Sequence, residues 1–342
     1  MPSIHPPMED SVMTSLVEIR QLSKFFPVTS GLMHRKTGDV KAVNEVSFEI
    51  FRGESLGVVG ESGCGKSTLA RLILSLIPPT SGTITFDGQD INRIGKNQLR
   101  HLRRKMQMVF QDPHSSLDPR NSIYRSLEEV FKIQKVPLSQ EKINARIVEL
   151  LDMVGLKPEH CRSYPHQLSG GQKQRAVIAR ALALTPEFII LDEPTAALDV
   201  SVQAQIILLL QQLGDQFNMT YLFISHDLAL VDYFCQRIIV MYLGKIVEIT
   251  PANLSQKQPR HPYTKVLMES VYVADPLKKT QTPIIKGEVP SLFNIPEGCS
   301  FENRCSFAKD ICRKKSPELM EIVPGEFMAC HFPLTYPEED DA

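Results

Sequence analysis

Short apolar runs alternate along this chain with longer stretches in which apolar residues recur at helical spacing. Three runs, at residues 56–59, 188–191 and 221–224, have the length and composition of strands that are buried on both faces. Such strands belong to parallel sheets, which need long crossover connections that are usually helices. The pattern therefore predicts an α/β fold built around a parallel sheet.

The first ninety residues carry further strand patterns. Residues 17–20 and 46–50 resemble strands, and the polar, basic segment at 29–39 is expected to be a loop between them. Another strand pattern at residues 83–86 ends at the turn signal of residues 87–88. This part of the chain is predicted to be rich in strands.

The middle and the end of the chain differ in character. Residues 91–165 are helical and charged, with one strand pattern at 106–110, and this predicts a helical insert in the α/β domain. From about residue 258 prolines and lysines become more frequent and regular periodicity fades. We therefore expect one domain at 1–257 and a C-terminal segment at 258–342.

Composition narrows the possible classes of protein. The chain has 342 residues, enough for one large domain with an appendage, and a net charge of −1 that gives no overall attraction to nucleic acid or an anionic membrane. No apolar run approaches the roughly 18 residues that a membrane span requires. The polar N-terminus predicts no signal peptide, so we expect a cytosolic protein with reduced thiols.

One glycine-rich stretch carries the first candidate chemistry. Residues 60–67 read G-E-S-G-C-G-K-S and fit the phosphate-binding pattern G-x-x-x-x-G-K-[ST]. The stretch follows a predicted strand and precedes a helical pattern that we expect to run to residues 78–79. Backbone N–H groups and Lys66 would bind phosphates there, and the hydroxyl of Ser67 would bind Mg²⁺.

Two carboxylates follow the apolar run at 188–191. Asp192 lies where a parallel strand beside such a loop ends, which is a position suited to holding Mg²⁺. Glu193 would then act as the general base that polarises an attacking water.

A second phosphate-binding surface is predicted at Leu168–Gln172, which reads L-S-G-G-Q. Ser169 can cap the following helix, and the two glycines expose N–H groups at the positive end of that helix. Both surfaces are difficult to place around one nucleotide within a monomer. We therefore expect a head-to-tail dimer with the nucleotide between the subunits.

These motifs, together with Gln111, A-L-D at 197–199 and His226, form an ordered set that resembles the ATP-binding subunits of ABC transporters. The resemblance covers about residues 17–335 and implies a P-loop ABC ATPase. That fold has a RecA-like core, an antiparallel β subdomain and a helical subdomain, here with a small irregular C-terminal extension carrying a cysteine cluster. It also implies ATP and Mg²⁺ as cofactors.

The resemblance assigns roles to single residues. Gln111 contacts Mg²⁺ and water and senses the membrane subunit, Asp199 lies at the subunit interface, and His226 touches the γ-phosphate. Phe26 is expected to stack on adenine, with Phe25 as its competitor. The predicted catalytic residues are Lys66, Gln111, Glu193 and His226, and the Mg²⁺ ligands are Ser67, Gln111 and Asp192. Further nucleotide contacts are predicted at Gly60, Glu61, Ser62, Gly63, Cys64, Gly65, Thr68, Ser169, Gly170, Gly171, Gln172 and Asp199.

The last 44 residues contain four of the seven cysteines, namely Cys299, Cys305, Cys312 and Cys330. In a reducing compartment such a group indicates a metal site rather than disulfides. Zinc usually has closer cysteine pairs, so an iron–sulfur cluster fits these spacings at least as well. Weakly packed free thiols are the alternative.

This cysteine group follows the stretch His261-Pro262-Tyr263-Thr264, and the combination resembles the C-terminal extension of oligopeptide and dipeptide importer ATPases. In that family the cysteines are associated with a [4Fe–4S] cluster. The insert at 26–43 is most similar to the ATPase paralogue that is usually encoded last. The resemblance implies a heterodimer with a paralogous ATPase, two transmembrane permease subunits and, indirectly, a substrate-binding protein.

The expected activity is thus ATP hydrolysis that powers peptide import at the cytoplasmic face of the bacterial inner membrane, without nucleic acid. Two other classes stay open: a soluble ABC ATPase, and a redox sensor in which the cysteines carry the main function. An importer of nickel or another small solute is a further alternative.

Overall fold

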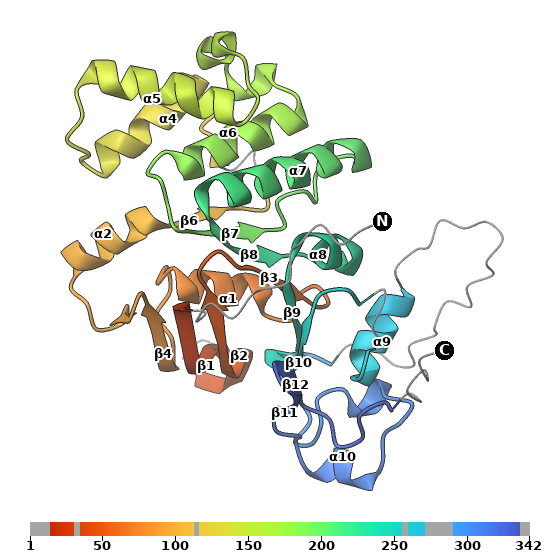
Figure 1. The fold of residues 1–342 in the computed structure, drawn as a ribbon. Helices are drawn as coiled ribbons and strands as arrows, with labels where there is room; N and C mark the ends of the chain where they lie inside the picture. Colours follow the sequence, from red (N-terminus) through yellow and green to blue (C-terminus); the bar gives the residue numbers. More distant parts are fainter. Residues whose placement is uncertain (1–13, 31–34, 113–115, 255–258, 271–289, 336–342) are drawn as a thin grey trace, which may run out of the picture.

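The computed structural model describes residues 14–30, 35–112, 116–254, 259–270 and 290–335 (Figure 1). The strands are β1 (Ser15–Ser30), β2 (Arg35–Phe51), β3 (Ser55–Val59), β4 (Ser81–Phe86), β5 (Gln89–Asp90), β6 (Met106–Val109), β7 (Phe188–Asp192), β8 (Thr220–Ile224), β9 (Arg237–Tyr242), β10 (Lys245–Pro251), β11 (Met320–Val323) and β12 (Glu326–Met328). The α-helices are α1 (Lys66–Ile73), α2 (Lys96–Lys105), α4 (Ile123–Ile133), α5 (Gln140–Met153), α6 (Gly170–Leu182), α7 (Val200–Phe217), α8 (Leu228–Phe234), α9 (Pro262–Glu269) and α10 (Asp310–Lys314).

The central sheet has the strand order β11-β12-β10-β9-β3-β8-β7-β6. Strands β9, β3, β8, β7 and β6 are parallel to one another, whereas β10, β12 and β11 continue the sheet from β9 in antiparallel pairs. The three apolar runs are its strands β3, β7 and β8, so the prediction of a parallel α/β sheet is confirmed. Successive strand residues point to opposite faces of the sheet, so that Ile190 packs in one core and Leu191 in another.

A smaller antiparallel sheet, ordered β2-β1-β4-β5, packs with α1 over one of these cores. The expectation of a loop at residues 29–39 was wrong for the described part. Strand β1 continues to Ser30, and β2 begins at Arg35, with pairs as distal as Thr29 and Lys36. Backbone pairing holds this arm of the hairpin although its side chains are polar.

The helix after the glycine-rich loop is shorter than the sequence predicts. Helix α1 ends at Ile73 and is followed by a turn in which Ser75 has a left-handed φ of +52°. That conformation ends the helix before the two prolines are reached.

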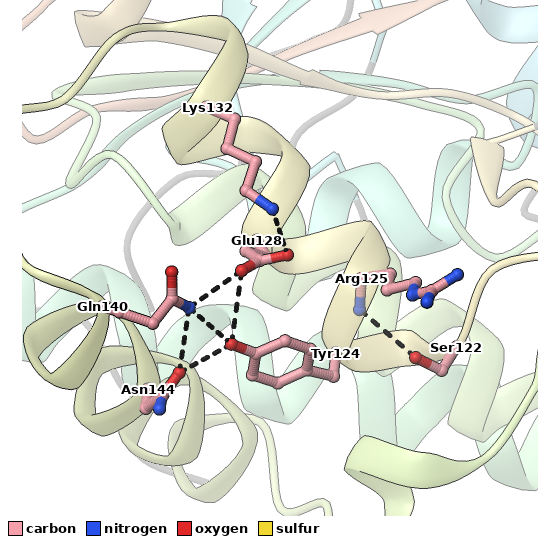
Figure 2. A network of polar contacts seen from close by, with 7 residues as sticks. All are labelled: Ser122, Tyr124, Arg125, Glu128, Lys132, Gln140 and Asn144. Carbon is pink, nitrogen blue, oxygen red and sulfur yellow. Dashed lines mark hydrogen bonds and ion pairs between the residues drawn. The ribbon is translucent and has the colours of Figure 1, made fainter.

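Helices α4, α5 and α6 contact one another and form a lobe at one end of the molecule (Figure 1). Figure 2 shows the polar network between the first two of these helices. The hydroxyl of Tyr124 donates to Asn144 at 2.6 Å, and the amide of Gln140 donates to Tyr124 and to Glu128, each at 2.8 Å. Lys132 pairs with the same glutamate at 2.7 Å. These bonds fix α4 against the start of α5.

The C-terminal segment packs beside β10 and α9 (Figure 1). Strand β12 pairs with β10, and Tyr263, Phe301 and Tyr242 form an aromatic cluster that joins this segment to the core. Among the described residues, no helix combines the length and apolar character needed to cross a membrane.

Candidate functional site

The glycine-rich loop lies between β3 and α1 and depends on glycine at two close approaches. Gly60 and Gly65 have φ values of +152° and +112°. A Cβ atom at Gly60 would lie 2.2 Å from the carbonyl oxygen of Met241, and one at Gly65 would lie 2.0 Å from that of Ala42. Any side chain at either position would displace the backbone of a neighbouring strand or turn, so the loop requires glycine there.

Lys66 is buried at the centre of this loop. Its ammonium group donates to the carbonyl oxygens of Gly60 at 2.7 Å and Glu61 at 3.0 Å. The thiol of Cys64 is also buried and 3.8 Å from the ammonium, and burial raises the pKa of that thiol. The positive charge of Lys66 thus lies at the N-terminus of α1, which has no side-chain cap, and this is an anion-binding arrangement.

Two of the three predicted Mg²⁺ ligands, Ser67 and Asp192, lie together. The hydroxyl of Ser67 donates to Oδ1 of Asp192 at 3.1 Å, although the residues are 125 positions apart in the chain. Burial raises the pKa of the Asp192 carboxyl group. A hydroxyl and a carboxylate at this distance are oxygen donors of the type that Mg²⁺ prefers. Thr68 follows in the first turn of α1.

Gln111, Glu193 and His226 converge from three separate segments. The amide of Gln111 donates to Oε2 of Glu193 at 2.8 Å, and Nδ1 of His226 is 3.4 Å from Oε1 of the same carboxylate. Glu193 follows β7 with a φ of +48°, and its N–H donates to the carbonyl of Ile224 at the end of β8. This backbone anchor holds the carboxylate between an amide and an imidazole.

Ser169 caps α6, as predicted. Its hydroxyl accepts from the N–H of Gln172 at 3.3 Å, and the side chain of Gln172 accepts from the N–H of Ser169 at 2.9 Å. A Cβ atom at Gly171 would lie 2.6 Å from Val202, so this glycine allows α6 to approach α7 closely. A Cβ atom at Gly170, the first residue of α6, would lie 3.2 Å from Leu198. Helix α6 contributes to one core and α1 to the other, so this turn and the glycine-rich loop lie in different layers of the subunit (Figure 1).

Asp199 caps α7 at the surface. Its carboxylate accepts from the hydroxyl of Ser201 at 2.6 Å and from the N–H of Val202 at 3.0 Å. The hydrogen bond from Ser201 lowers the pKa of this carboxyl group. The side chain is therefore an ordered, charged group that faces solvent in the single subunit.

The two candidate aromatic residues differ in exposure. Phe26 is 39% exposed, with the Lys24 ammonium 5.1 Å from the centre of its ring. Phe25 is less exposed and has Lys41 at 5.9 Å. The more exposed ring leaves more of its face for a ligand.

Two contacts on the glycine-rich loop were not predicted from the sequence. Arg304 donates to both carboxylate oxygens of Glu61, each at 2.9 Å, and the N–H of Glu61 donates to the hydroxyl of Tyr263 at 2.9 Å. The arginine lies 243 positions from its partner. The stretch His261–Thr264 is visible in the sequence as a motif, but no local pattern there points to the loop.

The four C-terminal cysteines line one small pocket of about 10 Å³ and are all unpaired. Burial raises the pKa of Cys299 and of Cys330 to about 11, and it also raises that of Cys305. Within the part of the chain that the structure describes, no three or more His, Cys, Asp or Glu side chains form a group able to hold a metal ion. The predicted iron–sulfur or zinc site is therefore not supported by this side-chain arrangement.

Comparisons with known proteins agree with this geometry. Residues 43–196 match the family model "ABC transporter", and residues 247–312 match "Oligopeptide/dipeptide transporter, C-terminal region". The oligopeptide transport ATP-binding protein AppF of Bacillus subtilis is 49% identical over 93% of this chain and 97% of its own length. A putative peptide import ATP-binding protein of Brucella ovis is 45% identical over 93% of this chain and 98% of its own.

A solved structure supports the fold. The ATP-binding cassette MJ0796, described as a dimer in a post-hydrolysis state bound to ADP and Pi, matches with a TM-score of 0.61 and 30% identity. The match covers 69% of this chain and 99% of that one. With identity approaching one half over nearly the full length of its relatives, this chain belongs to the family of ATP-binding proteins of oligopeptide-type ABC transporters.

Proposed function

We propose that this protein hydrolyses ATP to power the import of peptides through an ABC transporter. The observation that carries the proposal is the convergence of Gln111, Glu193 and His226 beside the loop that holds Lys66. A relative named as an oligopeptide transport ATP-binding protein supports the class of transport, and one named as a putative peptide import ATP-binding protein supports its direction.

Phosphoryl transfer needs mainly positioning and stabilisation of charge. In the proposed reaction Lys66 and the N–H groups of α1 hold the phosphates, and Ser67 with Asp192 would hold Mg²⁺, which neutralises phosphate charge when bound. Glu193 accepts a proton from the attacking water. Gln111 and His226, which both contact this carboxylate, orient it and the transferred phosphate.

The proposed working unit is a head-to-tail dimer. Ser169 and Asp199 lie in a different layer from the glycine-rich loop of their own subunit, and the matched cassette was solved as a dimer. We propose that the turn at 168–172 closes on the ATP of a paralogous partner subunit. The assembly would sit peripherally at the cytoplasmic face of the inner membrane, with two permeases and a substrate-binding protein.

The substitution Glu193→Gln tests the catalytic assignment. It preserves the shape of the side chain and its contact with Gln111 but removes the base, so we expect retained ATP binding, a stalled closed dimer and loss of transport. Glu149→Gln, on the exposed face of α5, is the matched control and should transport normally. Retained peptide uptake by Glu193→Gln would show that another group is the base.

A groove beside Gln111 is proposed to receive the permease. Its volume is about 270 Å³, and it is lined by Phe110, Leu76, Ile133 and other residues from both sides of the junction between the core and the helical lobe. These three side chains are exposed although apolar. We propose that a cytoplasmic coupling helix of the permease covers them.

Purification from native membranes tests this assembly. We expect two permeases, a paralogous ATPase and a peptide-binding protein to accompany the protein. Ile133→Asp should release the permeases without loss of ATP binding. The control Val148→Asp, on the exposed face of α5, should leave the permeases bound. Recovery without permeases from wild type would favour a soluble ABC ATPase instead.

The finer proposal for the C-terminal segment is that Cys299, Cys305, Cys312 and Cys330 hold a [4Fe–4S] cluster, with zinc as the alternative. The proposal rests on the resemblance and on four unpaired thiols around one pocket, although in the structure these side chains form no group able to hold a metal ion. Since burial raises the pKa of Cys299, Cys305 and Cys330, loading must displace protons from these thiols. Metal analysis and electronic absorption of anaerobically purified protein decide between iron and zinc. Cys305→Ser should lower stability or assembly, and a metal-free wild-type protein of normal stability would reject the proposal.

A further inference from the structure

A short C-terminal segment runs along the glycine-rich loop. Residues 290–292 line a cavity of about 280 Å³ together with loop residues 61–64 and with Tyr242 and Leu243. The N–H of Lys41 in β2 donates to the carbonyl of Leu292 at 3.2 Å. This segment therefore lies between the phosphate-binding loop and the β1–β2 hairpin.

The next residue, Phe293, lies directly against β2. A Cβ atom at Gly38 would be 2.5 Å from Cε2 and 2.6 Å from Cζ of the Phe293 ring. The glycine here has no left-handed φ, so its importance is the space that it leaves. The ring occupies that space and is still 40% exposed.

The strand register places this ring on the same face of the hairpin as Phe26. In the β1–β2 hairpin Phe26 pairs with Val40, and Val28 pairs with Gly38. Paired residues point to the same face of a sheet, as do residues two positions apart on one strand. The Cβ direction of Gly38, where the Phe293 ring lies, is therefore on the face of Phe26, about 7 Å further along the strand.

We propose that Phe293 is a second aromatic contact for the adenine base of ATP. The inference rests on the proposed function, in which Phe26 stacks on this base. Phe293 and Phe26 lie on one face of the hairpin and are exposed to similar fractions, 40% and 39%. A ring that served only to anchor the C-terminal segment would be more stable when buried. The C-terminal segment thereby supplies a base-binding residue to the nucleotide site of its own subunit.

Binding measurements with two ligands test the proposal. For Phe293→Ala, calorimetry with Mg-ATP should give a Kd raised about tenfold, as expected when a base–aromatic contact is lost. The Kd for inorganic tripolyphosphate, which has phosphates but no base, should not change. Phe217→Ala is the matched control, because Phe217 is also about half-exposed (44%) but lies at the end of α7.

Fluorescence gives a readout that does not depend on truncating the side chain. The chain contains no tryptophan, so Phe293→Trp carries a single one. Its emission should change on addition of Mg-ATP and stay constant with tripolyphosphate, whereas that of Phe217→Trp should respond to neither. Gly38→Ala, which pushes the Phe293 ring from its place, should weaken ATP binding without removing any aromatic residue.

The outcomes separate this inference from the proposed function. If wild type binds no ATP, the proposed function fails. If wild type binds ATP but Phe293→Ala binds it equally well and Phe293→Trp is silent, the base contact is refuted while the function stands. Equal weakening toward ATP and tripolyphosphate would also overturn the proposal, since it would make Phe293 a support for the loop.

Discussion

At the scale of single residues, Glu61 joins the glycine-rich loop to the C-terminal segment. Its carboxylate accepts two hydrogen bonds from the almost fully buried guanidinium of Arg304, and its N–H donates to the hydroxyl of Tyr263. A charged pair with two hydrogen bonds is strong when both bonds are made and costly when one partner is lost.

We expect Arg304→Ala to lower the free energy of unfolding by about 2–3 kcal/mol, because it leaves a partly buried carboxylate without its partner. Urea unfolding followed by circular dichroism measures this change. Arg313→Ala is the control, since its guanidinium is mostly exposed and 3.8 Å from Glu302, and it should cost well under 1 kcal/mol. Equal effects of the two variants would contradict the special position of Arg304.

His261 predicts a dependence of stability on pH. Burial lowers the pKa of this imidazole to about 4, against about 6.5 in an unfolded chain. Between these values the unfolded state takes up a proton that the folded state does not, so stability is full above about pH 6.5 and falls by about 3 kcal/mol toward pH 4.

His261→Asn keeps an acceptor for the N–H of Tyr263 but removes the titrating ring. Unfolding measured at pH 7 and pH 5 should therefore show a smaller difference for this variant than for wild type. His166→Asn changes an exposed histidine and should keep the wild-type difference. An unchanged difference in His261→Asn would assign the effect to other groups.

The sequence was sufficient for residues whose roles follow from a local pattern. Lys66, Ser67, Asp192 and Ser169 each lie beside a strand or helix end that short-range periodicity identifies, and the structure has them at such ends. Arg304 and Phe293 could not be predicted, because their partners lie more than two hundred positions away and neither is part of a periodic pattern.

At the scale of elements, buried strands were predicted better than exposed ones. Strands β3, β7 and β8 are buried at every position, and so their apolar runs identify them. The outer part of the β1–β2 hairpin is largely exposed, so its polar residues resemble a loop although the two strands pair as far as Ser30 and Arg35. The early end of α1 depends on the conformation of Ser75, for which the residue type gives no signal.

The network in Figure 2 makes a prediction about the helical lobe. Tyr124→Phe removes the hydroxyl that links α4 to Asn144 and Gln140 on α5, and it should lower the free energy of unfolding by about 1 kcal/mol. Lys132→Ala removes only the exposed pair with Glu128 and should cost about 0.3–0.5 kcal/mol. Thermal unfolding of both variants measures the difference. A loss no larger in Tyr124→Phe would mean that packing alone joins the helices.

At the scale of the whole molecule, the C-terminal segment is continuous with the core. Strands β11 and β12 extend the central sheet beyond β10, and Arg304 and Phe293 reach the glycine-rich loop and the hairpin. The division into 1–257 and 258–342 stays a prediction about function. The change in composition near residue 258 gave no indication that the sheet would continue after it.

A chain that ends at Ser270 would lack the two added strands. Its β10 would then expose a row of unpaired N–H and C=O groups next to an apolar, buried stretch, which is a template for pairing between molecules. We expect such a fragment to form oligomers in light scattering, whereas a chain that ends at Thr335 stays monodisperse under the same conditions. A monodisperse fragment would refute this expectation. In this expectation β12 covers the edge of β10 and so prevents the core from pairing with a second molecule there.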